Sequence, residues 1–240
     1  MGITREVVLR LKRRHRGYLI VLGVQVLLLL LLPVAQHVPW LLSVLMISLC
    51  CVLIAFVSRF SPFRRTRPLV YALGALAVIM EVAWHLSLRF TPLLGQWLTI
   101  PHVIVWLMFL VLSLLRKVRT LIGEPYVTTS VVMGAASGYL LVGISGGVLL
   151  TAIAALSPLS LTVSSFSTAH VTGMTSPGIA VDAPSLMAAS FNMLTTVGTP
   201  VVNPTDVLGQ VAITIITVSG QLYVAILIAL ILGRFHKRKP

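Results

Sequence analysis

Six long apolar runs divide the chain, and each is long enough to cross a bilayer as a helix. A helix needs about 20 mainly apolar residues to span the hydrocarbon core. The breaks between runs carry residues typical of turns, such as Ser61-Pro62 and Gly123-Glu124-Pro125. We therefore expect an all-α membrane protein with six transmembrane helices, at roughly 17–35, 40–57, 68–88, 98–115, 127–156 and 207–233.

The composition changes between the fifth and sixth runs. Residues 157–183 are rich in Ser, Thr, Gly and Pro, which is typical of a loop. Asp182-Ala183-Pro184 then indicates a helix start, with a capping carboxylate and a proline in the first turn. The helix to Leu194 would be about 17 Å long, which is too short to cross a bilayer. The pattern predicts a re-entrant half-helix.

Extended backbone containing Gly198 and Pro200 follows this half-helix. Non-helical backbone at membrane depth is tolerated only where it is buried in protein or lines water. The segment from Thr195 to Pro200 is therefore a candidate functional site on physical grounds alone.

The basic residues fix the expected orientation. The net charge is +13, from 18 Lys+Arg against 5 Asp+Glu, and with six spans every basic residue except Arg89 falls on one side. The positive-inside rule then puts both termini in the cytoplasm, with anionic lipid headgroups as the partner of the charge. At 58% hydrophobic and 10% charged residues, the chain is excluded from the ordinary soluble proteins. We expect a multi-pass protein of the cell membrane and no nucleic-acid partner.

The order of these elements resembles the pore module of potassium channels, whose filter sequence is Thr-Val-Gly-Tyr-Gly. The likeness is to prokaryotic six-span, potassium-channel-like membrane proteins. It rests on Thr195-Thr196-Val197-Gly198 after a half-helix, and on Gly220-Gln221-Leu222-Tyr223 at the matching distance in the last helix. It covers roughly 127–233, whereas the first four spans match only in number and orientation.

The resemblance implies a domain division and a mechanism. Residues 1–122 would hold the cytoplasmic N-terminus and a four-helix domain, and residues 123–240 the pore domain. Four copies would present rings of backbone carbonyls that replace the hydration shell of potassium, so the resemblance implies a homotetramer. Potassium would be the permeant ion, with no other cofactor.

The resemblance also assigns roles to single residues. Thr195 would close the half-helix, and Gly220 would be the flex point of the inner helix. Thr196 would supply a hydroxyl and a carbonyl to the ion, and Val197 and Gly198 would supply carbonyls. The whole predicted filter comprises Thr196, Val197, Gly198, Thr199 and Pro200.

The outer part of this filter departs from the family pattern. Thr199 stands where the family has tyrosine, Pro200 where it has the second glycine, and Val201 where it has aspartate. Threonine cannot fill the volume of tyrosine, and proline fixes φ and lacks an N–H group. A weakly selective cation pore and a non-conducting regulatory subunit therefore stay open as alternatives.

Two further functional classes are less favoured by the sequence. A secondary transporter would need a second broken helix in the first half. The chain has no catalytic triad, zinc pair or phosphate loop in a plausible context, so we do not expect an enzyme. Voltage sensing is not expected either, because 98–115 contains no arginine, and Arg116, Lys117 and Arg119 are interpreted as anchors at the membrane surface.

Glu81 is the one carboxylate inside a predicted span, and His85 and Arg89 follow it at i+4 and i+8. The three residues share a helix face, so they form an internal charge string that is either structural or proton- or ion-sensing. Trp40, Trp84 and Trp97 lie near predicted span ends, where interface tryptophans are expected, whereas Trp106 lies deeper and should pack inside. The glycines of Gly143-Ile144-Ser145-Gly146-Gly147 are expected to allow close helix packing.

Overall fold

The computed structural model describes residues 5–60, 67–90, 92–122, 129–157, 161–163, 179–197, 202–204 and 206–236. It is an all-helical protein with one pair of three-residue strands. The long helices are α1 (Arg5–Ala35), α2 (Pro39–Phe60), α3 (Arg67–Phe90), α4 (Pro92–Ile122), α5 (Thr129–Leu156) and α7 (Val207–His236). The shorter α6 (Ile179–Leu194) lies between α5 and α7 in the chain.

Each long helix contains a stretch long and apolar enough to cross a membrane. These stretches are Arg16–Ala35, Trp40–Ser58, Pro68–Ser87, Trp97–Ile122, Val131–Leu156 and Val207–Ala229. They coincide with the six runs expected from the sequence, so that prediction is confirmed. The structure is that of a multi-pass membrane protein.

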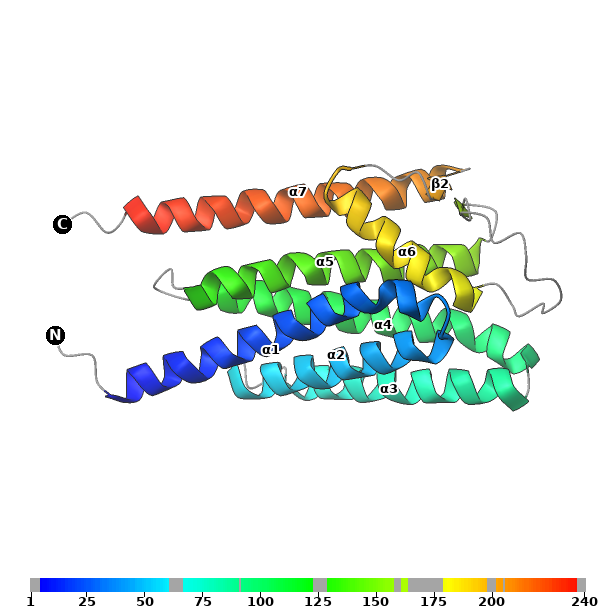
Figure 1. The fold of residues 1–240 in the computed structure, drawn as a ribbon, viewed down its shortest axis with the longest axis horizontal. Helices are drawn as coiled ribbons and strands as arrows, with labels where there is room; N and C mark the ends of the chain where they lie inside the picture. Colours follow the sequence, from blue (N-terminus) through cyan, green and yellow to red (C-terminus); the bar gives the residue numbers. More distant parts are fainter. Residues whose placement is uncertain are drawn as a thin grey trace.

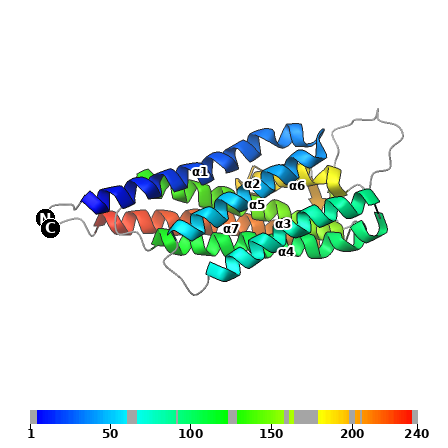
Figure 2. The ribbon, with the colours of Figure 1, turned by 90° about the horizontal axis from the view of Figure 1, so that it is seen from below.

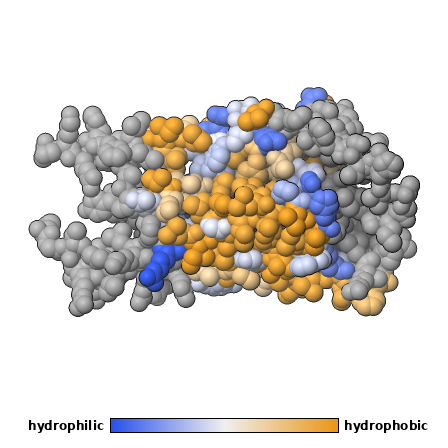
Figure 3. Space-filling view, in the orientation of Figure 1, coloured by the Kyte–Doolittle hydropathy of each residue, from blue (hydrophilic) through white to orange (hydrophobic). Residues whose placement is uncertain are grey.

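The helices run side by side along the long axis of the molecule (Figure 1, Figure 2). The start of α1 and the end of α7 lie at the same end of the bundle, which we call the terminal end (Figure 1). The opposite end carries the two strands, and we call it the strand end. Apolar side chains cover the middle of the face seen in Figure 3, as a lipid-facing surface requires.

Helix α5 is the centre of the bundle. It contacts α1, α4, α6 and α7, and 61% of its apolar stretch is buried. The stretch in α7 is only 17% buried, because α7 packs mainly on α5 and α6. The buried apolar residues form two clusters, a large one among α1 to α5 with Met187 of α6, and a smaller one among α5, α6 and α7.

Two short strands were not expected from the sequence. β1 (Leu161–Val163) and β2 (Val202–Pro204) pair antiparallel, with Thr162 opposite Asn203. They join the segment after α5 to the segment before α7. Asp206 then begins α7 by accepting a hydrogen bond from the Gly209 N–H at 2.8 Å, which is the geometry of an N-cap.

The start of α6 differs from the expectation. The helix begins at Ile179 rather than at Asp182, so Asp182 lies inside it and Pro184 is its sixth residue. A proline at this place removes one hydrogen bond near the beginning of the helix, which the fold tolerates. With 16 residues, α6 is about 24 Å long, still shorter than the hydrocarbon core of about 30 Å.

Candidate functional site

Close packing of α6 on α5 depends on glycine. A Cβ added at Gly143 would collide with the ring of Phe191, and one added at Gly147 would lie 2.8 Å from the Met187 Cα. The buried hydroxyl of Ser190 lies 2.6 Å from the Gly143 carbonyl oxygen and donates across the contact. The expectation that these α5 glycines serve close packing is confirmed. The contacts also show that α6 runs antiparallel to α5.

The carboxyl end of α6 is closed by a specific backbone motif. The Val197 N–H donates to the Asn192 carbonyl at 3.1 Å, and the Thr196 N–H donates to the Met193 carbonyl at 3.1 Å. This pair of bonds defines a Schellman motif, in which the residue at the position of Thr196 adopts a left-handed conformation. Thr196 has a φ of 60°, whereas glycine usually occupies that position. A β-branched residue there stores backbone strain.

Thr195 lies directly after the last helical residue of α6. Its N–H donates to the Phe191 carbonyl at 3.0 Å, and its hydroxyl lies 2.9 Å from the same oxygen. The Thr196 hydroxyl donates to the Thr195 carbonyl at 2.6 Å. Thr195, Thr196 and Val197 are all exposed, Val197 at 78%. The other predicted filter residues, Gly198, Thr199 and Pro200, lie outside the described residues.

The last residue of α6 is held between α5 and α7, far from either end of the bundle. A Cβ added at Gly220 of α7 would lie 2.6 Å from Leu194 Cδ1 and 3.1 Å from the Leu194 carbonyl oxygen. The Tyr139 hydroxyl of α5 donates to that same carbonyl at 3.1 Å. Gly220 lies about 20 Å along α7 from its first residue. The α6 helix therefore starts near the strand end and stops in the middle of the bundle (Figure 1).

The residues from Gly220 to Tyr223 have different structural roles. Gly220 admits the end of α6, and its use as a flex point stays a prediction. Tyr223 ties α7 to α5, because its hydroxyl donates to the Ala135 carbonyl at 2.8 Å. Gln221 and Leu222 between them are exposed.

Helix α7 carries a polar stripe that the sequence analysis did not identify. Its members follow at intervals of four, three and four residues, which places them on one helix face. Three of them are exposed and Thr217 is half-buried. The polar stripe comprises Gln210, Thr214, Thr217 and Gln221.

The other faces of α7 are apolar. The face that packs on α5 and α6 includes Gly209, Ala212, Ile216 and Gly220, all buried. A third face is apolar and about half exposed, and it includes Val211, Ile215, Val218 and Leu222. Because an exposed amide in lipid is unfavourable, the polar stripe is suited to water or to another protein surface, and the third face to lipid or protein.

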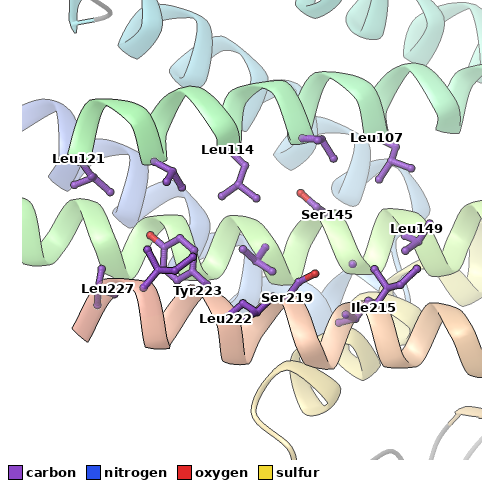
Figure 4. A pocket seen from close by; sticks show the side chains of 16 residues that line it. Leu107, Leu114, Leu121, Ser145, Leu149, Ile215, Ser219, Leu222, Tyr223 and Leu227 are labelled. Carbon is purple, nitrogen blue, oxygen red and sulfur yellow. The ribbon is translucent and has the colours of Figure 1, made fainter. Parts of the chain in front are cut away.

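A groove of about 380 Å³ separates α7 from α4. Figure 4 shows Leu107, Leu114 and Leu121 of α4 on one side and side chains of α7 on the other, with α5 as the floor. The Ser145 hydroxyl in the floor donates to the Leu141 carbonyl of its own helix. The groove is therefore almost wholly apolar.

A second polar group lies among α2, α3 and α4, around the predicted charge string. Glu81 is 5% exposed, and its Oε2 lies 2.6 Å from His102 Nε2 and 2.7 Å from the Trp106 indole nitrogen that donates to it. Glu81 Oε1 lies 3.7 Å from His85 Nε2. The sequence pattern pairs Glu81 with His85 but does not indicate His102 and Trp106, which stand four residues apart in the apolar α4.

The surroundings of this group revise one expectation. Trp84 is buried rather than at an interface: its indole stacks on His102 with ring centroids 5.2 Å apart and donates to the Thr99 hydroxyl at 2.9 Å. Trp40 and Trp97 are largely exposed, as an interface position requires, and Trp106 is buried as expected. The side chain of Arg89 lies outside the described residues.

The basic residues of α4 also differ from the expectation. Lys117 and Arg116 are buried inside the bundle instead of lying at the membrane surface, whereas Arg119 is exposed. The Lys117 ammonium donates to the Ser137 hydroxyl of α5, which donates to Gln25 Oε1 of α1 at 2.5 Å. A lysine at the end of an apolar run can point outward or inward, and hydropathy does not distinguish the two.

Within the described part of the chain, no group of three or more His, Cys, Asp or Glu side chains is arranged to hold a metal ion. Comparison with known protein families, curated proteins and solved structures found no match for this chain.

Proposed function

We propose that the protein is a potassium-channel-like pore that passes monovalent cations across the cell membrane as a homotetramer. The observation that carries the proposal is the course of α6, which stops in mid-bundle against Gly220 and leaves Thr195 to Val197 exposed at its end. In a membrane this is a re-entrant half-helix, because β1 and β2 join its flanking segments at the strand end. Backbone that emerges at such a depth is suited to a water-filled path.

The electrostatics of α6 favour a cation. The carboxyl end of a helix carries about half a negative charge from its carbonyl groups. The Schellman motif uses the carbonyls of Asn192 and Met193, and Tyr139 caps that of Leu194, so the end of α6 is held in one orientation. A partial negative charge in a fixed direction stabilises a cation that passes the exposed residues.

The polar stripe of α7 supports the same reading. Four copies of α7 around an axis would turn Gln210, Thr214, Thr217 and Gln221 toward a shared aqueous cavity, and the apolar third face toward lipid or a neighbouring copy. One chain by itself leaves the stripe facing lipid, which is unfavourable for the glutamine amides. The stripe therefore also supports an oligomer.

The departures at Thr199 and Pro200 keep a weakly selective cation pore as the alternative to a potassium-selective one. The absence of Lys and Arg from α4 before Arg116 argues against steep voltage gating. The basic residues at the terminal end support an orientation with both termini in the cytoplasm.

The test is ion flux from proteoliposomes that contain the purified protein, with potassium and sodium gradients compared. Gly198→Val adds a side chain in the predicted filter and should abolish flux while leaving assembly intact. Gly23→Val is the matched control, because nothing lies within 4 Å of a Cβ at Gly23. It should conduct like the parent protein.

A second pair of variants tests the proposed aqueous cavity that the polar stripe of α7 would line. Gln221→Glu should raise cation flux and Gln221→Lys should lower it, because the two place opposite charges on the polar stripe. Equal fluxes of potassium and sodium identify the weakly selective pore. Intact tetramers without flux for either ion would favour the regulatory subunit, and unchanged flux in Gly198→Val would refute the filter assignment.

A further inference from the structure

The buried group around Glu81 borders a cavity that the proposed pore does not use. The cavity has a volume of about 100 Å³, enough for several water molecules. Its walls come from α2, α3, α4, α5 and the first part of α6, including Ala183 and Met187 of α6. It lies toward the strand end, because Ser43, Thr99 and Thr151 in its wall stand near the ends of their helices.

The described lining of this cavity contains a carboxylate but no lysine or arginine that would compensate its charge. A lone carboxylate inside a membrane is strongly unfavourable unless a positive charge compensates it. The described lining residues offer Glu81, His85 and His102 as ionisable groups, with Ser43, Thr99 and Thr151 as neutral polar neighbours and only apolar side chains from α6. The side chains of Asp182 and Arg89, the next charged residues along α6 and α3, lie outside the described residues. No described lysine or arginine lines the cavity.

The contact between Glu81 and His102 can supply the missing positive charge, because the imidazole can bind a proton. His102 Nε2 and Glu81 Oε2 are 2.6 Å apart, which is a charge-assisted hydrogen-bond distance. His102 Nδ1 is buried and has no hydrogen-bond partner among the described residues, so its lone pair or proton is available. One proton taken from solvent converts the carboxylate and neutral imidazole into a carboxylate–imidazolium pair, with no other bond formed or broken. The pair is then neutral overall.

We propose that Glu81 and His102 form an intramembrane proton-binding site. His85 extends the site toward the outside of the bundle: its side chain is 38% exposed, its Nε2 lies 2.6 Å from the Ser43 hydroxyl, and it is 3.7 Å from Glu81. A metal ion is not the ligand of this site, since the described ionisable groups do not converge in a metal-binding arrangement. The cavity has room for the water that carries the proton.

Tryptophan fluorescence tests the site without any need for ion conduction. Trp84 stacks on His102, and the Trp106 indole nitrogen lies 3.1 Å from His102 Nε2, so a charge on the imidazole changes the emission of both. The exposed Trp40 and Trp97 are replaced by phenylalanine, so that only the two buried indoles report. In nanodiscs this protein should show one fluorescence transition as the pH is varied, with the slope of a single proton.

Two variants and one control decide the outcome. His102→Gln should abolish the transition, and Glu81→Gln should move its midpoint down by at least one pH unit, or about tenfold in proton affinity, because the compensating charge is lost. His37→Gln, which alters an exposed histidine at the turn before α2, should leave the transition unchanged. A parent protein without a transition, or a transition that survives His102→Gln, overturns the proposal. Either result leaves the flux test of the pore unaffected.

Discussion

Thr196 offers a direct test of how the end of α6 is built. It holds the left-handed position of the Schellman motif, where glycine is usual, with a φ of 60°. The left-handed conformation costs an L-residue roughly 1–2 kcal/mol. Glycine would remove that strain but would lose about 0.5–1 kcal/mol through its greater freedom in the unfolded chain. The Thr196→Gly substitution should therefore stabilise each chain by about 0.5–1 kcal/mol.

This gain is measurable as a thermal shift. For a chain of this size, 1 kcal/mol corresponds to about 2–4 °C in Tm, so Thr196→Gly should raise the Tm by roughly 1–4 °C. Loss of the Thr196 hydroxyl subtracts little, because its hydrogen bond to the Thr195 carbonyl is exposed and water can replace it. The assay is thermal unfolding in nanodiscs, followed by circular dichroism.

Two further variants, Thr196→Ala and Thr196→Ser, separate the effect of the backbone strain from the effect of the hydroxyl. Alanine keeps the strained backbone and removes the hydroxyl, so its Tm should stay near that of the parent protein. If the hydroxyl contacts the ion as proposed, alanine and glycine should both reduce discrimination between potassium and sodium, whereas serine should keep it. A Tm that falls in Thr196→Gly, or rises equally in Thr196→Ala, would refute the strain argument.

Three further predictions concern contacts elsewhere in the bundle. Gly220→Ala places a Cβ against the end of α6 and should destabilise the protein by about 1–3 kcal/mol in thermal unfolding, whereas Gly23→Ala, with open space around it, should stabilise α1 by about 0.5–1 kcal/mol. Ser137→Ala removes the partner of a buried ammonium and should cost about 1–3 kcal/mol, whereas Lys117→Met should be neutral or stabilising; the reverse order in denaturant titration would contradict this account. Tyr223→Phe removes one hydrogen bond between α7 and α5 and should lower stability by about 0.5–1.5 kcal/mol, with unchanged stability as the contrary result.

Hydropathy alone predicted the number and extent of the spans, because each run must match the thickness of the bilayer. It also predicted a short helix that ends at Leu194, since the polar Thr195-Thr196 pair interrupts the apolar pattern. The start of α6 was misplaced because Asp182 and Pro184 are common at the first helical positions but are not confined to them. Local signals fix such a boundary only to within a turn.

Contacts between helices were beyond the sequence, since they depend on how each helix is rotated about its axis. Glu81 and His85 were paired correctly because they stand one turn apart on α3, whereas His102 joins them only through the packing of α4 on α3. The burial of Lys117 likewise depends on which face of α4 meets α5. The β1–β2 pair depends on a contact between distant segments, which no local pattern in three residues can specify.

The spans are unevenly buried, and the stretch in α7 is only 17% buried. A helix that only anchors a protein in lipid can be apolar on every exposed face, as the third face of α7 is. The polar stripe of α7 has no such match in lipid, and it stands on the same helix whose Gly220 receives the end of α6. A single chain therefore exposes a partial negative helix end and glutamine amides, both of which are unfavourable in hydrocarbon. Both become favourable together if copies of the chain enclose water and a cation.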